Sequence, residues 1–271
     1  FAKDEYASIL KLNSLNEENQ ILKIIEPIKY IEDINAIISQ EFIGTDFFIK
    51  LRSYHLSSPS NQKKIKESSE SLAKAIVIIC SSKPLGKEKY PTGRLKEKIL
   101  KYTNIISDNS FNEEDFDNKI INILSLRSVA MTTGYKGFDI RNILLSKEGK
   151  ICILDPGKEK LETQEAFIAR FYATLLILFW GSPLFFFKYK VHGDLLEIFD
   201  NVIYENLEID RIALLLEIRK ELLKHWSLAL RALAEKKWPI FFKKLIKKTY
   251  INNFYKSSLN KNKKSLIDLI D

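Results

Sequence analysis

The sequence predicts an α+β fold with few strands and many helices, and two patterns carry this prediction. Residues 143–154 contain two apolar runs on either side of a polar turn with Gly149, which is typical of a β-hairpin. From Thr163 onward the apolar residues recur at helical spacing, in runs at 164–180, 194–206, 210–233 and 238–256. A short β element followed by four helices indicates a mixed fold whose core is mostly helical.

The first third of the chain predicts a helix, two β-rich runs and a second helix. Residues 4–12 place apolar side chains at helical spacing, and the runs at 21–31 and 35–44 are rich in isoleucine. Residues 57–66 are polar and are expected to form a loop. Residues 67–80 begin with serines and acids and become strongly apolar, as expected of a buried helix.

The middle of the chain predicts a loop and two more helices before the hairpin. Residues 81–95 contain two prolines and two glycines, which are typical of a loop. Helices are expected near 95–105 and near 117–131, with an acidic turn between them.

The composition excludes several classes of protein. The chain has 271 residues, 45% of them hydrophobic, which is too apolar for a disordered protein and long enough for a sizeable core. The net charge of +8 belongs to residues 231–271, which hold 11 basic and three acidic residues, whereas residues 1–230 hold 32 of each. The body therefore has no electrostatic reason to bind nucleic acid. No G-x-G occurs, which excludes a dinucleotide-binding or P-loop phosphate cradle in this chain.

Cysteine and histidine give no sign of a disulfide framework or a metal cluster. Cys80 and Cys152 each lie in an apolar run and are expected to be buried thiols in a reducing compartment, and the three histidines are far apart. The chain begins with Phe1 and carries no signal-peptide pattern, so we expect further residues before Phe1 in the natural protein and a cytoplasmic location.

The segment from Asn142 to Gly157 resembles the catalytic segment of the protein-kinase-like superfamily, nearest in style to its aminoglycoside, choline and sugar phosphotransferase branch. In that family an Asn at the end of the catalytic loop enters a hairpin that delivers an Asp-x-Gly triplet, and both residues bind the metal at the nucleotide phosphates. Here Asn142 and Asp155 stand 13 residues apart, the offset expected for the family. The resemblance implies ATP and Mg²⁺ as cofactors, with Asn142 and Asp155 as metal ligands.

The chain before this segment resembles the same family in the order of its elements. Glu5 stands where such kinases place a helix Glu that pairs with a strand Lys, and Glu41, Phe42 and Ile43 stand at the hinge that meets the adenine edge. The resemblance implies a protein-kinase-like fold with an incomplete small lobe that starts at the Glu5 helix, because the glycine-rich loop and the Lys would precede Phe1. We expect three parts: the partial small lobe and hinge at 1–50, the large lobe at 51–233, and a basic C-terminal segment at 234–271.

One departure from the family affects the expected chemistry. The family places its base Asp five residues before the metal Asn, and that position is Gly137 here. Asp139 is the nearest carboxylate, and it could be a displaced base or a residue that orders the loop by pairing with Arg141 or Lys136. The chain is therefore expected to be a phosphotransferase for a small-molecule, glycan or lipid-linked sugar hydroxyl, or a pseudokinase that acts as a binding or scaffold module. A third alternative is an unrelated helical protein with a chance motif.

Two apolar or basic segments raise the question of a membrane. Residues 171–187 lack charge, which fits a buried helix followed by a loop, a membrane contact through residues 183–187, or a short span. Residues 236–264 combine lysines with an aromatic stripe that includes Trp238 and Phe241. This segment is expected to be a docked helix with a solvated lysine face, or a contact with a partner protein or with an anionic surface on the inner face of a membrane. Nucleic acid is disfavoured because no motif for it accompanies the charge.

Overall fold

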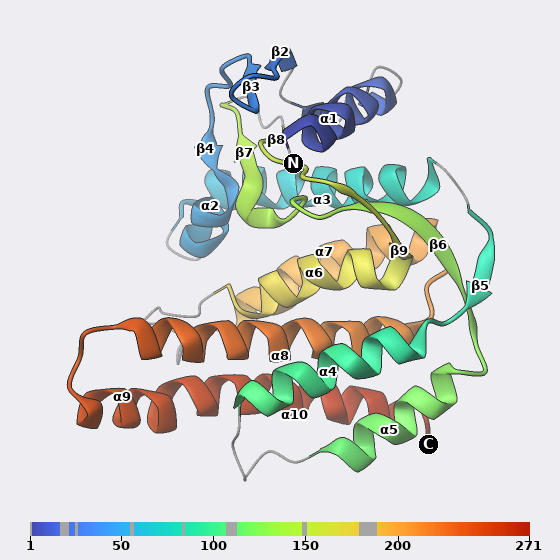
Figure 1. Cartoon of the computed structure of the whole chain (residues 1–271), viewed down its shortest axis with the longest axis vertical. Helices are drawn as coiled ribbons and strands as arrows, with labels where there is room; N and C mark the ends of the chain where they lie inside the picture. Colours follow the sequence, from blue (N-terminus) through green and yellow to red (C-terminus); the bar gives the residue numbers. More distant parts are fainter. Residues whose placement is uncertain are drawn as a thin grey trace. The chain divides into compact units, whose positions relative to one another are not determined.

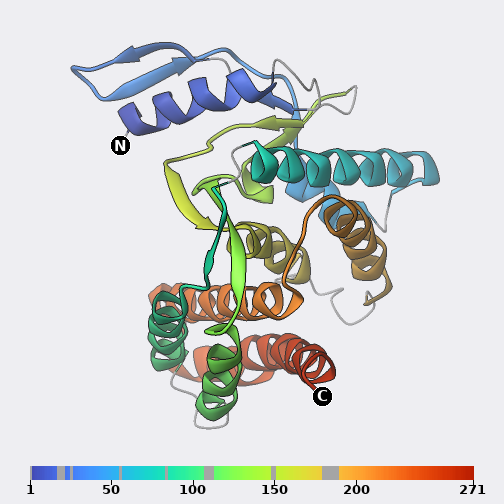
Figure 2. The ribbon, with the colours of Figure 1, turned by 90° about the vertical axis from the view of Figure 1, so that its right-hand side faces the viewer.

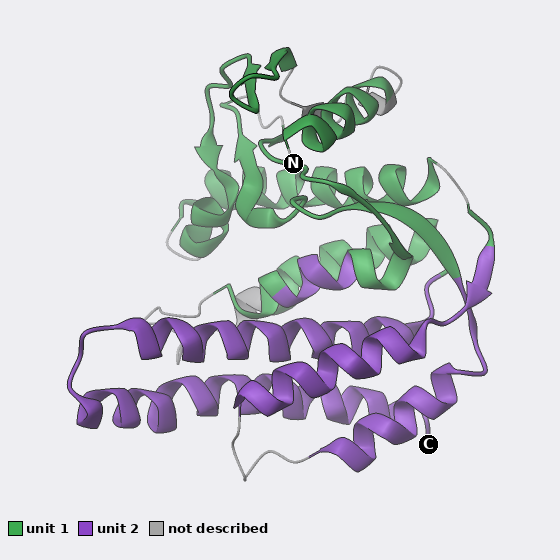
Figure 3. Ribbon diagram, viewed as in Figure 1, with its two compact units in different colours: residues 1–86, 130–167, 174–208 green, residues 87–129, 168–173, 209–271 purple. Residues whose placement is uncertain are grey.

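The computed structural model describes residues 2–16, 22–24, 27–54, 57–82, 85–106, 113–147, 151–178 and 189–271 of the chain (Figure 1). Internal contacts divide the chain into two compact units that interleave along the sequence (Figure 3). Unit 1 comprises residues 1–86, 130–167 and 174–208, and unit 2 comprises residues 87–129, 168–173 and 209–271. The division at residues 50 and 233 that the sequence suggests stays a prediction.

Unit 1 begins with the predicted helix and two β-rich runs. Helix α1 (Ala2–Asn16) packs against β2 (Pro27–Ile31) and β3 (Ala36–Ser39), which pair antiparallel beside it (Figure 2). Asn35 lies in the turn between these strands with a φ of 48°, in the left-handed region that asparagine tolerates better than most residues. The short β2–β3 hairpin thus accounts for most of residues 27–39.

The predicted strand–turn–strand pattern lies at the centre of a four-stranded sheet in unit 1. Strands β7 (Ile143–Leu145) and β8 (Ile151–Ile153) pair antiparallel, which confirms the predicted hairpin. On the outer sides, β1 (Leu22–Ile24) pairs parallel with β8, and β4 (Thr45–Asp46) pairs antiparallel with β7. The turn residue Gly149 lies outside the described residues.

Helix α3 (Pro59–Ser81) is the predicted buried helix, but it begins about two turns earlier than expected. The loop predicted at 57–66 is therefore wrong from Pro59 onward. The Ser58 side chain accepts a hydrogen bond from the Asn61 amide at 3.4 Å, and a proline fits the first turn because its missing N–H has no helical partner there. Most side chains of these two turns are exposed, so their polar composition resembles that of a loop.

Helix α2 (Phe47–Ser53) precedes α3 in the sequence, whereas α6 (Gln164–Leu176) and α7 (Tyr189–Asn206) come after the hairpin. Helix α7 packs along α3 within unit 1. Residues 179–188 lie outside the described residues, and with them the apolar patch expected at 183–187. Among the helices in the described ranges, none is long and apolar enough to cross a membrane.

Strands β6 (Ser128–Tyr135) and β9 (Glu159–Thr163) were not expected from the sequence. They pair antiparallel over five residues, from Met131 opposite Thr163 to Tyr135 opposite Glu159. The helix predicted at 117–131 is therefore wrong in its last part, because α5 (Glu114–Leu124) ends before the strand. Valine and threonine in residues 128–135 favour a strand, and the pairing with β9 stabilises it.

Unit 2 is built mainly from helices around α8 (Arg211–Glu235), which contacts α4 (Thr92–Ile106), α5 and α10 (Asn252–Asp268). The helix predicted at 238–256 extends further, because α9 (Ile240–Ile246) continues through one π-helical turn at 247–251 into α10. Strand β5 (Lys87–Lys89) also belongs to unit 2.

Candidate functional site

The β7–β8 hairpin brings Asn142 and Asp155 to the same end of its sheet. Asn142 directly precedes β7, and Asp155 lies two residues after the end of β8. The Leu154 amide donates a hydrogen bond to the Asn142 carbonyl at 2.9 Å, so the antiparallel ladder continues one step beyond the strands. The 13-residue offset thus corresponds to one hairpin whose two open ends are neighbours.

The Asn142 side chain closes the loop that precedes it. Its Nδ2 atom donates a hydrogen bond to the Gly137 carbonyl at 2.6 Å, and its backbone amide donates to the Asp139 carbonyl at 2.9 Å. These two bonds hold the short 3-10 turn Ile140–Asn142 against residues 137–139. Because Nδ2 is used by the loop, the amide oxygen is the atom of this side chain suited to a cation.

Glu5 and Asp155 form a carboxyl pair, a contact that the sequence did not predict. Glu5 lies on α1, and its pKa is raised to about 7, first by burial and then by the charge of Asp155 and a hydrogen bond with it. Two ion pairs connect α1 to the segment that follows Asp155: Lys158 bonds Asp4 at 3.1 Å, and Lys11 pairs with Glu159. The side-chain bond from Lys158 also lowers the pKa of Asp4.

Gly137 packs directly against the Asp155-Pro156-Gly157 backbone. Its amide donates a hydrogen bond to the Pro156 carbonyl at 2.8 Å, and a Cβ added at Gly137 would lie 2.3 Å from the Asp155 carbonyl oxygen. Gly157 adopts a φ of 64°, and a Cβ there would lie 2.8 Å from the Gly137 nitrogen. The two glycines let the loop and the triplet approach more closely than any side chain would allow. The position of the family's base therefore has no room for an Asp in this structure.

Asp139, the candidate base, forms a two-bond ion pair with Arg141. Its Oδ1 accepts from Arg141 Nε at 2.8 Å and its Oδ2 from Nη2 at 3.0 Å. The carboxylate also accepts from the Arg141 amide at 3.0 Å and from the Thr174 hydroxyl at 3.4 Å. The sequence leaves Arg141 and Lys136 open as partners of Asp139, and in the structure Asp139 pairs with Arg141. This arrangement orders the loop, and Arg141 would have to move before Asp139 could accept a proton from a substrate.

The hinge candidates Glu41, Phe42 and Ile43 lie between β3 and β4, and Ile43 is 80% exposed. Directly after them, Thr45 pairs with Leu145 through the β4–β7 ladder, so the segment continues along the edge of the hairpin sheet. A Cβ at Gly44 would lie 3.1 Å from atoms of β7, which shows how closely the backbone passes that strand.

The oxygen donors at the hairpin end fit Mg²⁺. Mg²⁺ prefers oxygen ligands, and an amide oxygen from Asn142 with carboxylates from Asp155 and Glu5 meets that preference. Burial first and the neighbouring Asp155 charge second raise the pKa of Glu5, and a divalent ion would offset the negative charge of the two carboxylates. Within the described ranges, no three or more His, Cys, Asp and Glu side chains form a metal site on their own.

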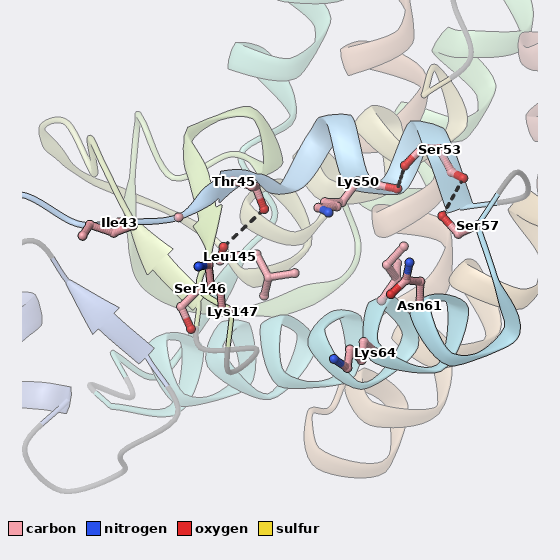
Figure 4. A pocket seen from close by; sticks show the side chains of 12 residues that line it. Ile43, Thr45, Lys50, Ser53, Ser57, Asn61, Lys64, Leu145, Ser146 and Lys147 are labelled. Carbon is pink, nitrogen blue, oxygen red and sulfur yellow. Dashed lines mark hydrogen bonds between the residues drawn. The ribbon is translucent and has the colours of Figure 1, made fainter.

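A pocket of about 380 Å³ lies beside the hinge segment (Figure 4). Its walls come from the start of β4, from α2, from the first turns of α3 and from the end of β7. Three of its residues are lysines: Lys50, Lys64 and Lys147. These three lysines are far apart along the chain, so no local pattern in the sequence indicates that they line one cavity.

No protein-family model and no curated protein sequence matches this chain. Solved structures match it by fold. A glucosamine kinase aligns with a TM-score of 0.59 and 10% identity, over 96% of this chain and 70% of its own. The choline kinase LicA from Streptococcus pneumoniae aligns with a TM-score of 0.51 and 12% identity, over 95% of this chain and 81% of its own. A choline/ethanolamine kinase family protein from Mesorhizobium loti aligns with a TM-score of 0.55 and 9% identity, over 98% and 79%.

Two further structures show what these kinases bind. The glucosamine kinase also has a structure with glucosamine, ADP and inorganic phosphate, and LicA has one with AMP. At such low identity the alignments establish the fold alone. The chain has the protein-kinase-like fold of the choline and glucosamine kinases, as the segment from Asn142 to Gly157 predicted.

Proposed function

We propose that this chain is a phosphotransferase that uses Mg²⁺ and ATP to phosphorylate a hydroxyl group of a small molecule, a glycan or a lipid-linked sugar. The observation that supports it best is the convergence of Asn142, Asp155 and Glu5 at the open end of the β7–β8 hairpin. Related support comes from the glucosamine kinase and the choline kinase, whose structures contain ADP and AMP.

Each residue of the site has a proposed task. Asn142 and Asp155 would hold the metal, which would supply positive charge to offset the negative charge of the nucleotide phosphates. The Asn142–Gly137 hydrogen bond keeps the amide of Asn142 in one orientation, so that its oxygen is presented without further loss of freedom. Glu5 adds a carboxylate beside Asp155; its pairing with a lysine, which the family resemblance implies, is a separate proposal. The residues proposed for the adenine edge are Glu41, Phe42 and Ile43.

Asp139 is the proposed base. In the transfer, the substrate oxygen bonds to the γ-phosphorus as ADP leaves, and the hydroxyl proton passes to a carboxylate. For Asp139 to accept it, Arg141 must release at least one of its two bonds, and Arg141 has 52% of its side chain exposed, which leaves it room to swing away. The released guanidinium would then be available to pair with a phosphate oxygen.

A pseudokinase is the second candidate, and the closed loop favours it. Gly137 has no room for an Asp, and the only nearby carboxylate of the loop is already bonded to Arg141 and Thr174. Such a protein would bind nucleotide and metal through Asn142 and Asp155 without transferring the phosphoryl group.

Turnover in the Asp139→Asn variant separates the two candidates. ATP affinity of the full-length protein is measured by calorimetry with Mg²⁺ and with EDTA, and ADP formation is then followed with sugars and amino alcohols as acceptors. If the protein is an enzyme, we expect Mg²⁺-dependent ATP binding by both the wild type and the Asp139→Asn variant. The rate of ADP formation should then be about 10²–10⁴-fold lower in the variant, which is the usual contribution of a base. Binding without any ADP formation by the wild type would favour the pseudokinase, and absence of Mg²⁺-dependent binding would contradict both.

The surface of α9 supports a second proposal, contact with an anionic membrane. Large apolar and aromatic side chains in α9 and just before it are 45–72% exposed: Trp238, Ile240, Phe241, Phe242 and Leu245. None of the residues of α9 is buried. The docked helix expected from the sequence is therefore found for α10 but not for α9.

The charge around α9 matches an anionic lipid surface. Residues 236–248 contain six lysines and no acidic residue. Exposed aromatic side chains among lysines are typical of helices that lie in the headgroup region, where each basic residue contributes about 1 kcal/mol on anionic lipid. A partner protein would need an apolar surface with acidic edges, and no observation on this chain favours it over lipid.

Vesicle binding tests this surface. We expect the protein to co-sediment with vesicles of phosphatidylserine and phosphatidylcholine at low salt and to be released at high salt. Phe241→Ser with Phe242→Ser should weaken binding roughly tenfold or more, because two apolar side chains no longer enter the interface. The control is Leu228→Ser on α8, which removes an apolar side chain of similar exposure (47%) elsewhere. Equal binding to neutral vesicles, or self-association without lipid, would argue against it.

A further inference from the structure

The pocket beside the hinge segment carries three lysines on three separate walls. Lys50 comes from the last turn of α2, Lys64 from the second turn of α3, and Lys147 from the residues that follow β7 (Figure 4). No Asp or Glu is among the described residues that line it. Asp46, which directly follows the lining residue Thr45, caps α2 by accepting a hydrogen bond from the Ile49 amide at 3.1 Å.

The lysines of α3 differ in what they contact. Lys63 pairs with Glu67, Lys74 with Glu70 at 2.6 Å, and Lys66 with Asp194 at 3.0 Å. Lys64 forms none of these pairs and lines the pocket instead. The protein therefore places carboxylates next to the other lysines of this helix and leaves the pocket wall positive.

The first turns of α3 add to this positive field. Asn61 and Lys64 are three residues apart in the first two turns of α3, so they share one face of the helix, and this face lines the pocket. Ser57, which precedes the N-cap Ser58, lines the pocket beside them. Since α3 has 23 residues, the partial positive charge of its N-terminus is fully developed there. Like charges gathered around one cavity repel one another, and a bound anion would offset that repulsion.

The pocket is distinct from the proposed metal site. It is lined by Leu145 at one end of β7, whereas Asn142 precedes the other end, three residues or roughly 10 Å away along the strand. Neither Asn142, Asp155 nor Glu5 lines it. Its volume of about 380 Å³ lies within the range of small-molecule sites.

We propose that this pocket binds a small phosphate-bearing polyanion, held by Lys50, Lys64 and Lys147 together with the hydroxyl and amide groups of the wall. The lysines supply charge-assisted hydrogen bonds from three directions, and the hydroxyl-bearing residues Thr45 and Ser146 supply further polar contacts. This site is independent of the proposed phosphotransferase activity.

Pyrophosphate binding tests the proposal, measured by calorimetry on the full-length protein in EDTA so that the metal site does not contribute. The test variant is Lys50→Gln with Lys64→Gln, and the matched control is Lys63→Gln with Lys74→Gln, which removes the same charge outside the pocket. We expect the test variant to lose affinity about tenfold or more, since each lysine makes a bond to a charged group, while the control changes little. Lys147→Gln provides a second test if the double variant is less stable.

Three outcomes would overturn the proposal: wild-type affinity in the test variant and in Lys147→Gln, equal losses in test and control, or no pyrophosphate binding by the wild type. The Asp155→Asn variant should bind pyrophosphate as the wild type does. Loss of binding in Asp155→Asn alone would place the anion at the metal site instead. Failure of Mg²⁺-dependent ATP binding, in contrast, would leave this pocket unaffected and would contradict only the proposed function.

Discussion

Gly137→Asp is expected to abolish Mg²⁺-dependent nucleotide binding instead of supplying the missing base. A Cβ at this position would lie 2.3 Å from the Asp155 carbonyl oxygen and 3.0 Å from the Gly157 nitrogen. These are backbone atoms of the triplet that carries the proposed metal ligand, so they cannot rotate out of the way as a side chain would. The added carboxylate must push Asp155 and the loop apart, at a cost of about 1–3 kcal/mol in unfolding free energy.

Gly137→Ala separates crowding from charge. It adds only the Cβ, and we expect it to weaken nucleotide binding nearly as much as Gly137→Asp does. The control is Gly193→Ala in α7, where no atom lies within 4 Å of the added Cβ and alanine favours the helix, so stability should be unchanged or higher. Calorimetry measures the nucleotide affinity of each variant, and unfolding in urea measures its stability. A stable Gly137→Asp protein with new ATP turnover would show that the loop has space for a family-type base.

Arg219→Ala is expected to destabilise unit 2 by about 3–5 kcal/mol, the usual result of breaking a buried ion pair. The Arg219 side chain is fully buried on α8. Its Nε donates to Asp117 at 2.6 Å, a second nitrogen bonds Glu113, and the guanidinium lies 5.5 Å from the centre of the Phe116 ring. Removal of Arg219 leaves the buried Asp117 carboxylate without this partner and opens a cavity between α5, α8 and α10.

Urea unfolding measures this loss, with Arg231→Ala as a control that removes an exposed arginine from the same helix. The control should change stability by less than about 0.5 kcal/mol. Arg219→Met combined with Asp117→Leu should be more stable than the sum of the single variants predicts, because no buried charge is then left without its partner. A loss below about 1 kcal/mol for Arg219→Ala would mean that this network does not hold the three helices together.

The sequence predicted the parts of the fold whose signals are local. The hairpin around residues 143–154 shows its strands in two short apolar runs, and the start of α1 and the buried half of α3 show helical spacing of apolar residues. Strand β6 has a weaker local signal, in which its valine and threonines favour a strand. It is a strand because β9 pairs with it from about 30 residues away, and that partner is not visible in a local window.

The candidate site likewise contains residues that a local spacing in the sequence indicates and a contact that only the packing of the chain creates. Asn142 and Asp155 were found through their fixed offset, which one hairpin determines. The Glu5–Asp155 contact depends on how α1 packs, and no spacing in the sequence expresses it. The family resemblance predicts the base at the position of Gly137, and the structure adds that the Asp155–Gly157 backbone approaches this position too closely for a Cβ.

The central claim is that Asn142 and Asp155 bind one metal ion together with the nucleotide, and a double-mutant cycle tests it most directly. ADP affinity is measured with Mg²⁺ and with EDTA for the wild type, Asn142→Ala, Asp155→Asn and the double variant, with the exposed turn residue Asp33→Asn as control. We predict that each single variant loses about tenfold or more of the Mg²⁺-dependent affinity, that the double variant loses little more, and that the coupling is about 1–3 kcal/mol. Strictly additive losses, or equal ADP affinity with and without Mg²⁺ in the wild type, would contradict the claim.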